Sequence, residues 1–175
     1  MAAFLGDVLG LPEVRLVRGV KRRSKRTEMS TSLANDSSCL LLNDASISSL
    51  LQRVKTRCEK LGDDSEFFTS ESLTQRFRGN IVVRGVEAFV EETFTNLSRD
   101  QVNLRVSGPC KRCQMIKVEQ GTGEVTKEPL RSLAAMKNRN FNFGVHTRLN
   151  ISNQGFAWVS VGDVFKYNTI DSANN

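Results

Sequence analysis

The stretch VNLRVSGPCKRCQMIKVEQG, residues 102–121, contains the pattern that indicates the fold class. Residues 102–106 alternate apolar and polar side chains, which is typical of a strand with one buried face. The alternation resumes over 114–119, and the glycines of 121–123 then predict a turn. Similar strand patterns occur at residues 11–18, 39–42, 80–83 and 156–161. Many short strands with few helices predict an α+β domain with a barrel-like sheet.

One long amphipathic helix is predicted between residues 47 and 61. Its apolar positions recur along one helical face and are Ile47, Leu50, Leu51, Val54, Cys58 and Leu61. We expect Asp44 or Ser46 to cap this helix and Gly62 to end it. A second, short helix is expected from Pro129 to about Met136, since proline suits a first helical turn. The fold class is therefore strand-rich α+β with one or two helices.

The basic character of the chain comes mainly from one short run. The 175 residues include 25 Lys+Arg and 19 Asp+Glu, a formal net charge of +6. Five of these cations lie within 21–26, and without them the balance is 20 against 19, or +1. Such a run is compatible with nucleic-acid binding, but it contains no aromatic residue for base stacking. We therefore expect a solvated loop and not a nucleic-acid partner.

Composition excludes several classes of protein. The hydrophobic fraction of 39% and charged fraction of 25% are near those of globular domains, not of collagen-like, coiled-coil or disordered chains. No run approaches the roughly 18 apolar residues of a membrane span, and the first residues lack the features of a secretion signal. We expect a cytoplasmic protein whose four cysteines remain thiols.

The segment Gly108–Met115 (GPCKRCQM) is the strongest chemical signal. It places two thiols three positions apart with Lys111 and Arg112 between them, and neighbouring cations favour thiolate. A zinc site needs four ligands, whereas the chain has one such pair and one histidine, His146. A thioredoxin-like pair should open a helix, whereas residues 114–119 alternate as in a strand. Two further interpretations stay open: incidental cysteines, or a thiolate that ligates a soft metal beside cations that contact an anionic cofactor.

A second segment, Arg76 to Val83, places a cation and an amide at the start of a predicted strand. Taken alone, Arg78 is best explained as a surface arginine.

The sequence does not indicate other classes of catalytic site. A Ser-His-Asp triad would depend on His146, and the sequence contains no serine nucleophile elbow. The glycine turn at 121–123 lacks the residues of a phosphate-binding P-loop. The pair Glu91-Glu92 is expected on a solvated face and does not indicate a paired-carboxylate hydrolase.

Several segments together resemble the MOSC domain. They are Phe77–Val82 (FRGNIV), Gly108–Met115, Gln120–Gly123 (QGTG), Asn142–Gly144 (NFG) and Val161–Asp163 (VGD), with a further similarity over 33–46. In order and spacing they are most similar to the C-terminal domain of eukaryotic molybdenum cofactor sulfurases. The resemblance covers nearly the whole chain, with residues 1–170 as the MOSC domain and 171–175 as a frayed tail.

The resemblance implies binding of molybdenum cofactor, Mo-molybdopterin. It assigns cofactor contacts to Ser37, Arg78, Asn80, Lys111, Arg112 and Cys113. Cys113 corresponds to the cysteine that ligates molybdenum in the amidoxime-reducing relatives, so it is the candidate metal ligand and catalytic residue. Ser37 falls in a segment that approaches the cofactor phosphate in relatives. Relatives often have serine or histidine at the position of Lys111, and the role of Cys110 stays open.

The resemblance also implies a function and its partners. The domain would hold the cofactor while a terminal oxo ligand is exchanged for sulfur, which activates xanthine dehydrogenase and aldehyde oxidase. In a full sulfurase a pyridoxal phosphate desulfurase domain precedes this region and supplies the sulfur. We expect the present chain to lack that domain and the upstream MOSC strands, and to depend on a desulfurase-like domain or chain for any sulfurtransferase activity. The alternative is an oxidoreductase of the amidoxime-reducing type.

Overall fold

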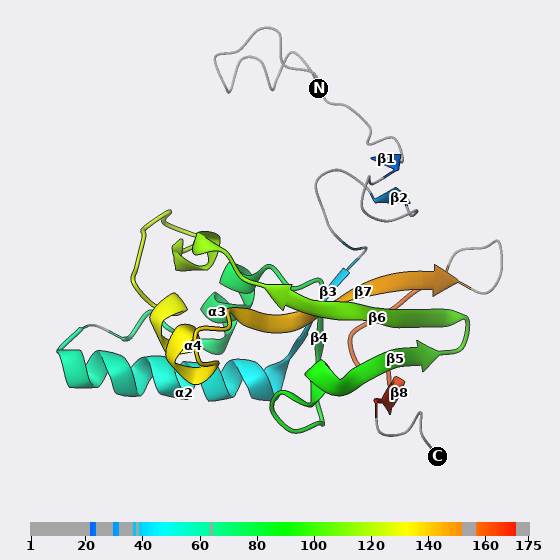
Figure 1. The fold of residues 1–175 in the computed structure, drawn as a ribbon, viewed down its shortest axis with the longest axis horizontal. Helices are drawn as coiled ribbons and strands as arrows, with labels where there is room; N and C mark the ends of the chain where they lie inside the picture. The colour runs from blue at the N-terminus through cyan, green and yellow to red at the C-terminus, as the bar shows by residue number, and fades with distance from the viewer. Residues whose placement is uncertain are drawn as a thin grey trace, which may run out of the picture. The chain divides into compact units, whose positions relative to one another are not determined.

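The computed structural model describes residues 22–23, 30–31, 37, 39–63, 65–151 and 157–170 (Figure 1). The chain divides into two units, Met1–Asp36 and Ser37–Asn175. In the first unit, β1 (Arg22–Arg23) pairs antiparallel with β2 (Ser30–Thr31). The strand expected at 11–18, the side chains of the basic run at 21–26 and the tail at 171–175 lie outside the described residues.

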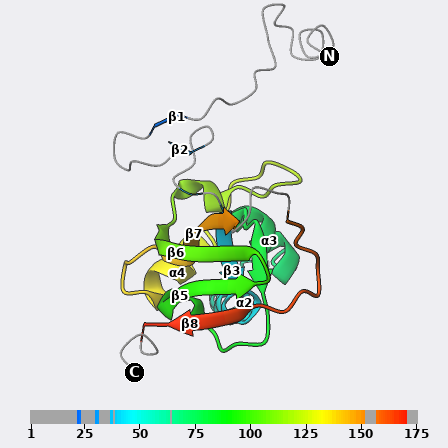
Figure 2. The same cartoon turned by 90° about the vertical axis from the view of Figure 1, so that its right-hand side faces the viewer.

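The second unit is built on a six-stranded sheet. Its strands are β3 (Cys39–Asn43), β4 (Ile81–Val83), β5 (Phe94–Arg99), β6 (Val102–Lys111), β7 (Asn142–Ile151) and β8 (Lys166–Thr169). They follow the order β4-β3-β7-β6-β5-β8, and all neighbours are antiparallel except β3 and β4. Figure 2 shows the sheet curling into a half-barrel. The predicted strand-rich α+β fold is therefore confirmed.

Three α-helices occur in the described ranges, one more than the upper number predicted. They are α2 (Asp44–Leu61), α3 (Ser70–Phe77) and α4 (Leu130–Met136), with short 3-10 turns η1 (Val90–Thr93) and η2 (Gln114–Lys117). None of these helices is long and apolar enough to cross a membrane. Gly62 ends α2 as predicted, in the left-handed conformation with φ 67°. The N-cap of α2 is Asn43 and not Asp44 or Ser46, because the backbone is still extended at Asn43 where the chain leaves β3.

The prediction of a strand at 114–119 is wrong. Residues 114–117 form η2, and only Val118 makes a β-bridge, to Val125. One apolar side chain of this segment, that of Ile116, reaches the core, and a single inward residue is compatible with a 3-10 turn. The described part of the strand expected at 156–161 is also irregular, although the turn at Gly162 and the strand β8 follow it. Trp158 in this segment is 87% exposed, so no sheet face buries it.

The sheet has a hydrophobic cluster on each face. Leu42 and Phe143 pack with α2, α3 and α4, in a cluster that also contains Cys58 in its predicted core position. Leu41 and Val145, which are neighbours in the register of β3 and β7, pack in the second cluster with residues of β5 and β6. Successive strand residues point to opposite faces, so β3 and β7 belong to both clusters. This arrangement holds the start of β4 and the end of β6 in fixed positions.

Candidate functional site

The two motif segments, 77–80 and 110–113, meet through the side chain of Arg112. Its Nη2 donates a short hydrogen bond to the carbonyl oxygen of Phe77, the last residue of α3. Its guanidinium carbon also lies 5.0 Å from the centre of the Phe77 ring, a cation–π arrangement. The contact joins residues 35 positions apart in the sequence. The fold therefore brings the end of α3 beside the loop after β6.

Arg78 holds an unusual backbone conformation at this junction. It is the C-cap of α3 with φ 56° and ψ 42°, and its N–H donates to the carbonyls of Thr74 and Gln75. This left-handed region favours glycine and costs about 1 kcal/mol or more for other residues. The Arg78 side chain is exposed and has no bonding partner among the described residues. An arginine at a position that suits glycine is a reason to look for a function of its cation.

Two glycines of the motifs are required for close packing against Leu42. A Cβ atom added to Gly79 would lie 2.5 Å from Cδ1 of Leu42. A Cβ on Gly144 would lie 2.6 Å from the other methyl group of Leu42 and 2.7 Å from the carbonyl oxygen of Leu41. Gly144 also has φ +73°, where glycine carries no penalty. These glycines let β4 and β7 approach β3 and so set the position of the site.

Strand β6 is irregular where the cysteine motif begins. Its pairing with β7 shifts between Val106 and Gly108 and again between Pro109 and Lys111. Such bulges redirect side chains and are common next to functional sites. Cys110 lies within the second shift and is buried, whereas Lys111 and Cys113, which follow it, are exposed. Neither exposed side chain has a bonding partner among the described residues.

Arg112 is the most fully occupied of the predicted contact residues. Besides its contact with Phe77, its Nη1 donates to the sulfur of Cys110 over 3.0 Å. Its Nε is buried and has no partner among the described atoms. The backbone N–H of Arg112 donates to the carbonyl of Phe141 over 2.8 Å. Arg112 is therefore a residue that holds the loop in place, and Cys110 has a structural role as its acceptor.

Asn80 and Ser37 also make internal hydrogen bonds. The Asn80 Oδ1 accepts from the N–H of Leu40 over 2.8 Å, and the Asn80 N–H donates to the Leu40 carbonyl over 2.9 Å. The Ser37 Oγ donates to the carbonyl of Cys39 over 3.0 Å and lies 2.8 Å from Nδ1 of His146. Asn80 therefore docks the start of β4 on β3, while its Nδ2 remains available. Ser37 is nearly buried and connects β7 to the chain before β3.

The four thiols differ in exposure. Cys113 is exposed and Cys39 half-buried, whereas Cys58 and Cys110 are buried. Burial raises the pKa of the Cys39 thiol and keeps it protonated at neutral pH. Within the described ranges, no three His, Cys, Asp or Glu residues are grouped closely enough to hold a metal ion. Cys113 is thus the thiol most open to an external ligand.

Arg76 is a buried residue beside the candidate site whose structural contacts were not predicted from the sequence. It is 1% exposed, and its Nη1 donates to the Lys117 carbonyl over 2.7 Å and to Oγ1 of Thr126 over 3.2 Å. Burial lowers the pKa of this guanidinium, opposed by the charges of Glu119 and Glu124. The bond to Lys117 ties α3, which ends beside Arg78, to the turn that follows Cys113. Helix α3 itself was not predicted, because its buried face includes this arginine.

This fold and these motifs define a MOSC domain, and the chain belongs to the MOSC domain family. The family model matches residues 28–166. Among curated proteins, the chain is 37% identical over 145 residues to molybdenum cofactor sulfurase of Bos taurus, 34% over 156 to that of Danio rerio and 35% over 139 to that of Homo sapiens. These alignments cover 81%, 83% and 78% of this chain but only 16%, 18% and 15% of the relatives.

Proposed function

We propose that this chain binds molybdenum cofactor and holds it while a terminal oxo ligand is exchanged for sulfur. The observation that carries the proposal is the meeting of the 77–80 and 110–113 segments through Arg112. This contact brings together an exposed cation, Arg78, and a loop that ends in the exposed thiol of Cys113. The similarity to molybdenum cofactor sulfurases supports the same role.

The donor set fits a molybdopterin group in its chemistry. Guanidinium and ammonium groups suit phosphate, and Arg78 and Lys111 have such groups free among the described residues. Thiolate suits a soft transition metal, and Cys113 supplies an exposed sulfur. When bound, the cofactor would supply molybdenum with an exchangeable terminal ligand. Asn80 would present its free Nδ2, whereas Arg112 and Ser37 would act mainly by holding the site together.

The proposed roles differ from the simple list of contacts that the resemblance implies. Arg78 and Lys111 would neutralise the anionic group of the cofactor, and Cys113 would face the metal and act in the transfer. Arg112 would keep the Cys110–Cys113 loop against α3 through its hydrogen bond to the Phe77 carbonyl, and this bond can persist when a ligand is bound. Ser37 would contact a phosphate only if its bond to His146 were exchanged.

Sulfur would come from a separate desulfurase-like domain or chain that uses pyridoxal phosphate. The sulfurated cofactor would then serve xanthine dehydrogenase and aldehyde oxidase, and we propose a cytoplasmic location for these steps. Because the alignments cover less than a fifth of the relatives, this chain would act as the cofactor-holding part of such a system.

The test is to express the 175-residue chain in a host that makes molybdenum cofactor and to measure bound pterin and metal. We expect pterin and molybdenum in equal amounts. Arg78→Gln should lose both pterin and molybdenum. Cys113→Ser should retain both, because the cofactor itself also holds the metal, and should lose sulfur exchange. The matched controls are Cys39→Ser, a thiol outside the 77–80 and 110–113 segments, and Arg105→Gln, an exposed arginine earlier on β6. Stoichiometric zinc without pterin in the parent chain would refute the proposal.

The exposed thiol of Cys113 also favours a second function, reduction of N-hydroxylated substrates of the amidoxime type, in which cysteine-ligated molybdenum receives electrons from a cytochrome partner. Turnover of an N-hydroxylated substrate by cofactor-loaded chain with a reconstituted electron-transfer chain would support it. Loaded protein without turnover, which nevertheless activates desulfo xanthine dehydrogenase when a desulfurase is added, would leave sulfur exchange as the function.

A further inference from the structure

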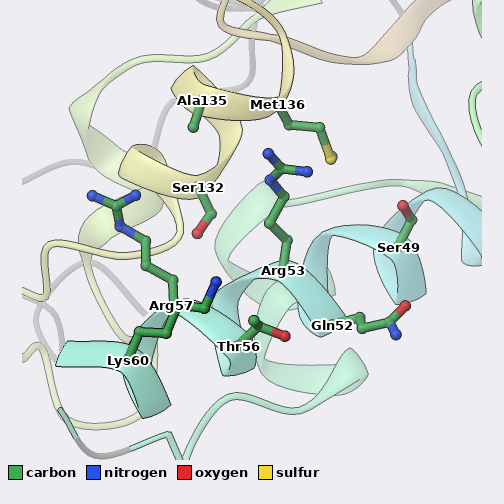
Figure 3. A pocket seen from close by; sticks show the side chains of 9 residues that line it. All are labelled: Ser49, Gln52, Arg53, Thr56, Arg57, Lys60, Ser132, Ala135 and Met136. Atoms are coloured by element: carbon green, nitrogen blue, oxygen red, sulfur yellow. The ribbon is translucent and has the colours of Figure 1, made fainter. Parts of the chain in front are cut away.

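A polar hollow lies between α2 and α4, and none of the motif residues of the proposed cofactor site lines it. Its volume is about 480 Å³, within the range of small-molecule sites. Figure 3 shows the side chains around it. They are Ser49, Gln52, Arg53, Thr56, Arg57 and Lys60 from α2 and Ser132, Ala135 and Met136 from α4.

The hollow is strongly cationic. Arg53, Arg57 and Lys60 lie four and three positions apart on α2, a spacing that places them on one helical face. None of the residues that line the hollow is acidic. Like charges at this spacing repel one another by a few tenths of a kcal/mol, and an anion bound between them would relieve this repulsion.

Only one of the three cations is neutralised within the described part of the chain. The Arg57 Nε lies 3.0 Å from Oε1 of Glu128, and the other carboxylate oxygen of Glu128 accepts from the N–H of Ser132 over 2.9 Å. One oxygen of this buried carboxylate therefore accepts a hydrogen bond, and the other lies against Arg57 as an ion pair without hydrogen-bond geometry. Arg53 and Lys60 have no ion-pair partner among the described residues. The hollow retains an uncompensated charge of two cations.

A buried hydroxyl group adds an independent indication of a ligand. The side chain of Ser132 is fully buried, lines the hollow, and has no hydrogen-bond partner for its Oγ in the described structure. Figure 3 shows the Arg53 and Arg57 side chains rising from α2 on either side of Ser132, whose hydroxyl points toward α2 between them. An unpaired buried hydroxyl destabilises a fold by about 1–3 kcal/mol. A ligand oxygen would remove this penalty.

We propose that this hollow binds the phosphate group of a small phosphorylated molecule. Guanidinium presents a planar pair of donors that matches phosphate oxygens, and the ammonium of Lys60 and the hydroxyl of Ser132 supply further donors. The site uses none of Ser37, Arg78, Asn80, Lys111, Arg112 and Cys113, so it does not depend on the proposed cofactor function. The volume accommodates a compact organic group as well as the phosphate.

Isothermal titration of the full chain with inorganic phosphate and with glycerol 3-phosphate tests the proposal and separates the two sources of the anion. Tighter binding of glycerol 3-phosphate would indicate a phosphomonoester, and equal binding a site for phosphate alone. Both should weaken as sodium chloride is raised, because salt screens the cations. We expect Arg53→Gln and Lys60→Gln each to weaken binding about tenfold, which corresponds to one charge-assisted hydrogen bond.

Lys55→Gln is the matched control, since it removes the same charge from an exposed position of α2 that does not line the hollow. It should leave affinity nearly unchanged. Ser132→Ala should weaken binding without destabilising the unliganded chain, because it removes an unpaired hydroxyl. Arg57 is left intact in these variants so that Glu128 keeps its partner.

Two outcomes would overturn the proposal. One is equal binding by the Arg53→Gln, Lys60→Gln and Lys55→Gln chains, which would indicate nonspecific attraction to a basic helix. The other is binding that survives these substitutions but is lost in Arg78→Gln, which would place the anion at the proposed cofactor site. Absence of measurable binding by the parent chain at low ionic strength would also refute it.

Discussion

Replacement of Arg112 by glutamine should destabilise the folded chain by about 2 kcal/mol. The hydrogen bond from its guanidinium to the Phe77 carbonyl contributes about 1.5 kcal/mol or more, as is usual for a charged donor. The cation–π contact with the Phe77 ring at 5.0 Å contributes about 0.5–1 kcal/mol. The bond to the Cys110 sulfur adds little, since sulfur is a weak acceptor. The substitution also removes the buried, unpartnered Nε, and the gain from losing this unsatisfied donor offsets part of the lost stability.

The assay is equilibrium unfolding in urea followed by far-ultraviolet circular dichroism. With a slope of about 2 kcal/mol per molar urea, a loss of 2 kcal/mol lowers the midpoint by about 1 M. Circular dichroism is preferred because the only tryptophan, Trp158, is 87% exposed and reports poorly on the core.

Arg105→Gln is the control for this measurement, since Arg105 is exposed on the same strand. A midpoint for Arg112→Gln equal to that of Arg105→Gln would refute the structural role of Arg112. The proposal that Arg112 positions the loop while Arg78 contacts the cofactor would then also be refuted.

Three further predictions concern the site and the turn beside it. Arg78→Gly should raise the free energy of unfolding by about 0.5–1 kcal/mol, because glycine suits the left-handed C-cap of α3, while the pterin content of purified protein falls; a loss of stability would contradict this. Gly144→Ala should lower the free energy of unfolding by more than about 2 kcal/mol, since its methyl group would meet the Leu41 carbonyl at 2.7 Å, and an unchanged urea midpoint would show that β7 can shift. The pKa of Glu119 is lowered mainly by the hydrogen bond from the Thr122 N–H, so its carboxylate stabilises the fold at neutral pH and loses this effect as the pH falls through its folded-state pKa. Glu119→Gln should therefore lower Tm above the ordinary glutamate pKa and match the parent chain at lower pH, and a Tm difference that persists in acid would contradict the assignment.

Local sequence patterns predicted the elements that have regular periods. The strand at 102–106 and the helix at 47–61 are both present because each buries most of one face. Leu61, at the end of the predicted helical face, is the exception and is 55% exposed. Helix α3 was missed because its eight residues bury a face formed by Leu73, Arg76 and Phe77, and a charged residue there hides the period. The pattern at 114–119 misled for the opposite reason, since alternation over a few residues also fits a 3-10 turn with one buried side chain.

The candidate site residues were chosen by motif similarity, but that similarity did not indicate which of them are free and which are occupied by internal contacts. Whether a cation is free depends on acceptors far away in the sequence, such as the Phe77 carbonyl for Arg112 and His146 for Ser37. These partners are set by how β3, β7 and α3 pack, which no local pattern encodes. For the same reason, the cationic hollow between α2 and α4 was not predicted, because it forms only when residues 53–60 and 132–136 meet.

The packing of both motif glycines on Leu42 links residues that have no chemical role in common. Each methyl group of Leu42 fills the place that a Cβ at Gly79 or Gly144 would occupy. A shorter side chain at position 42 should therefore tolerate alanine at 79, where only that leucine stands in the way. It should not tolerate alanine at 144, where a backbone carbonyl and a positive φ also exclude it. Among diverging homologues, positions 42 and 79 should consequently change together, while the glycine at 144 stays fixed on its own.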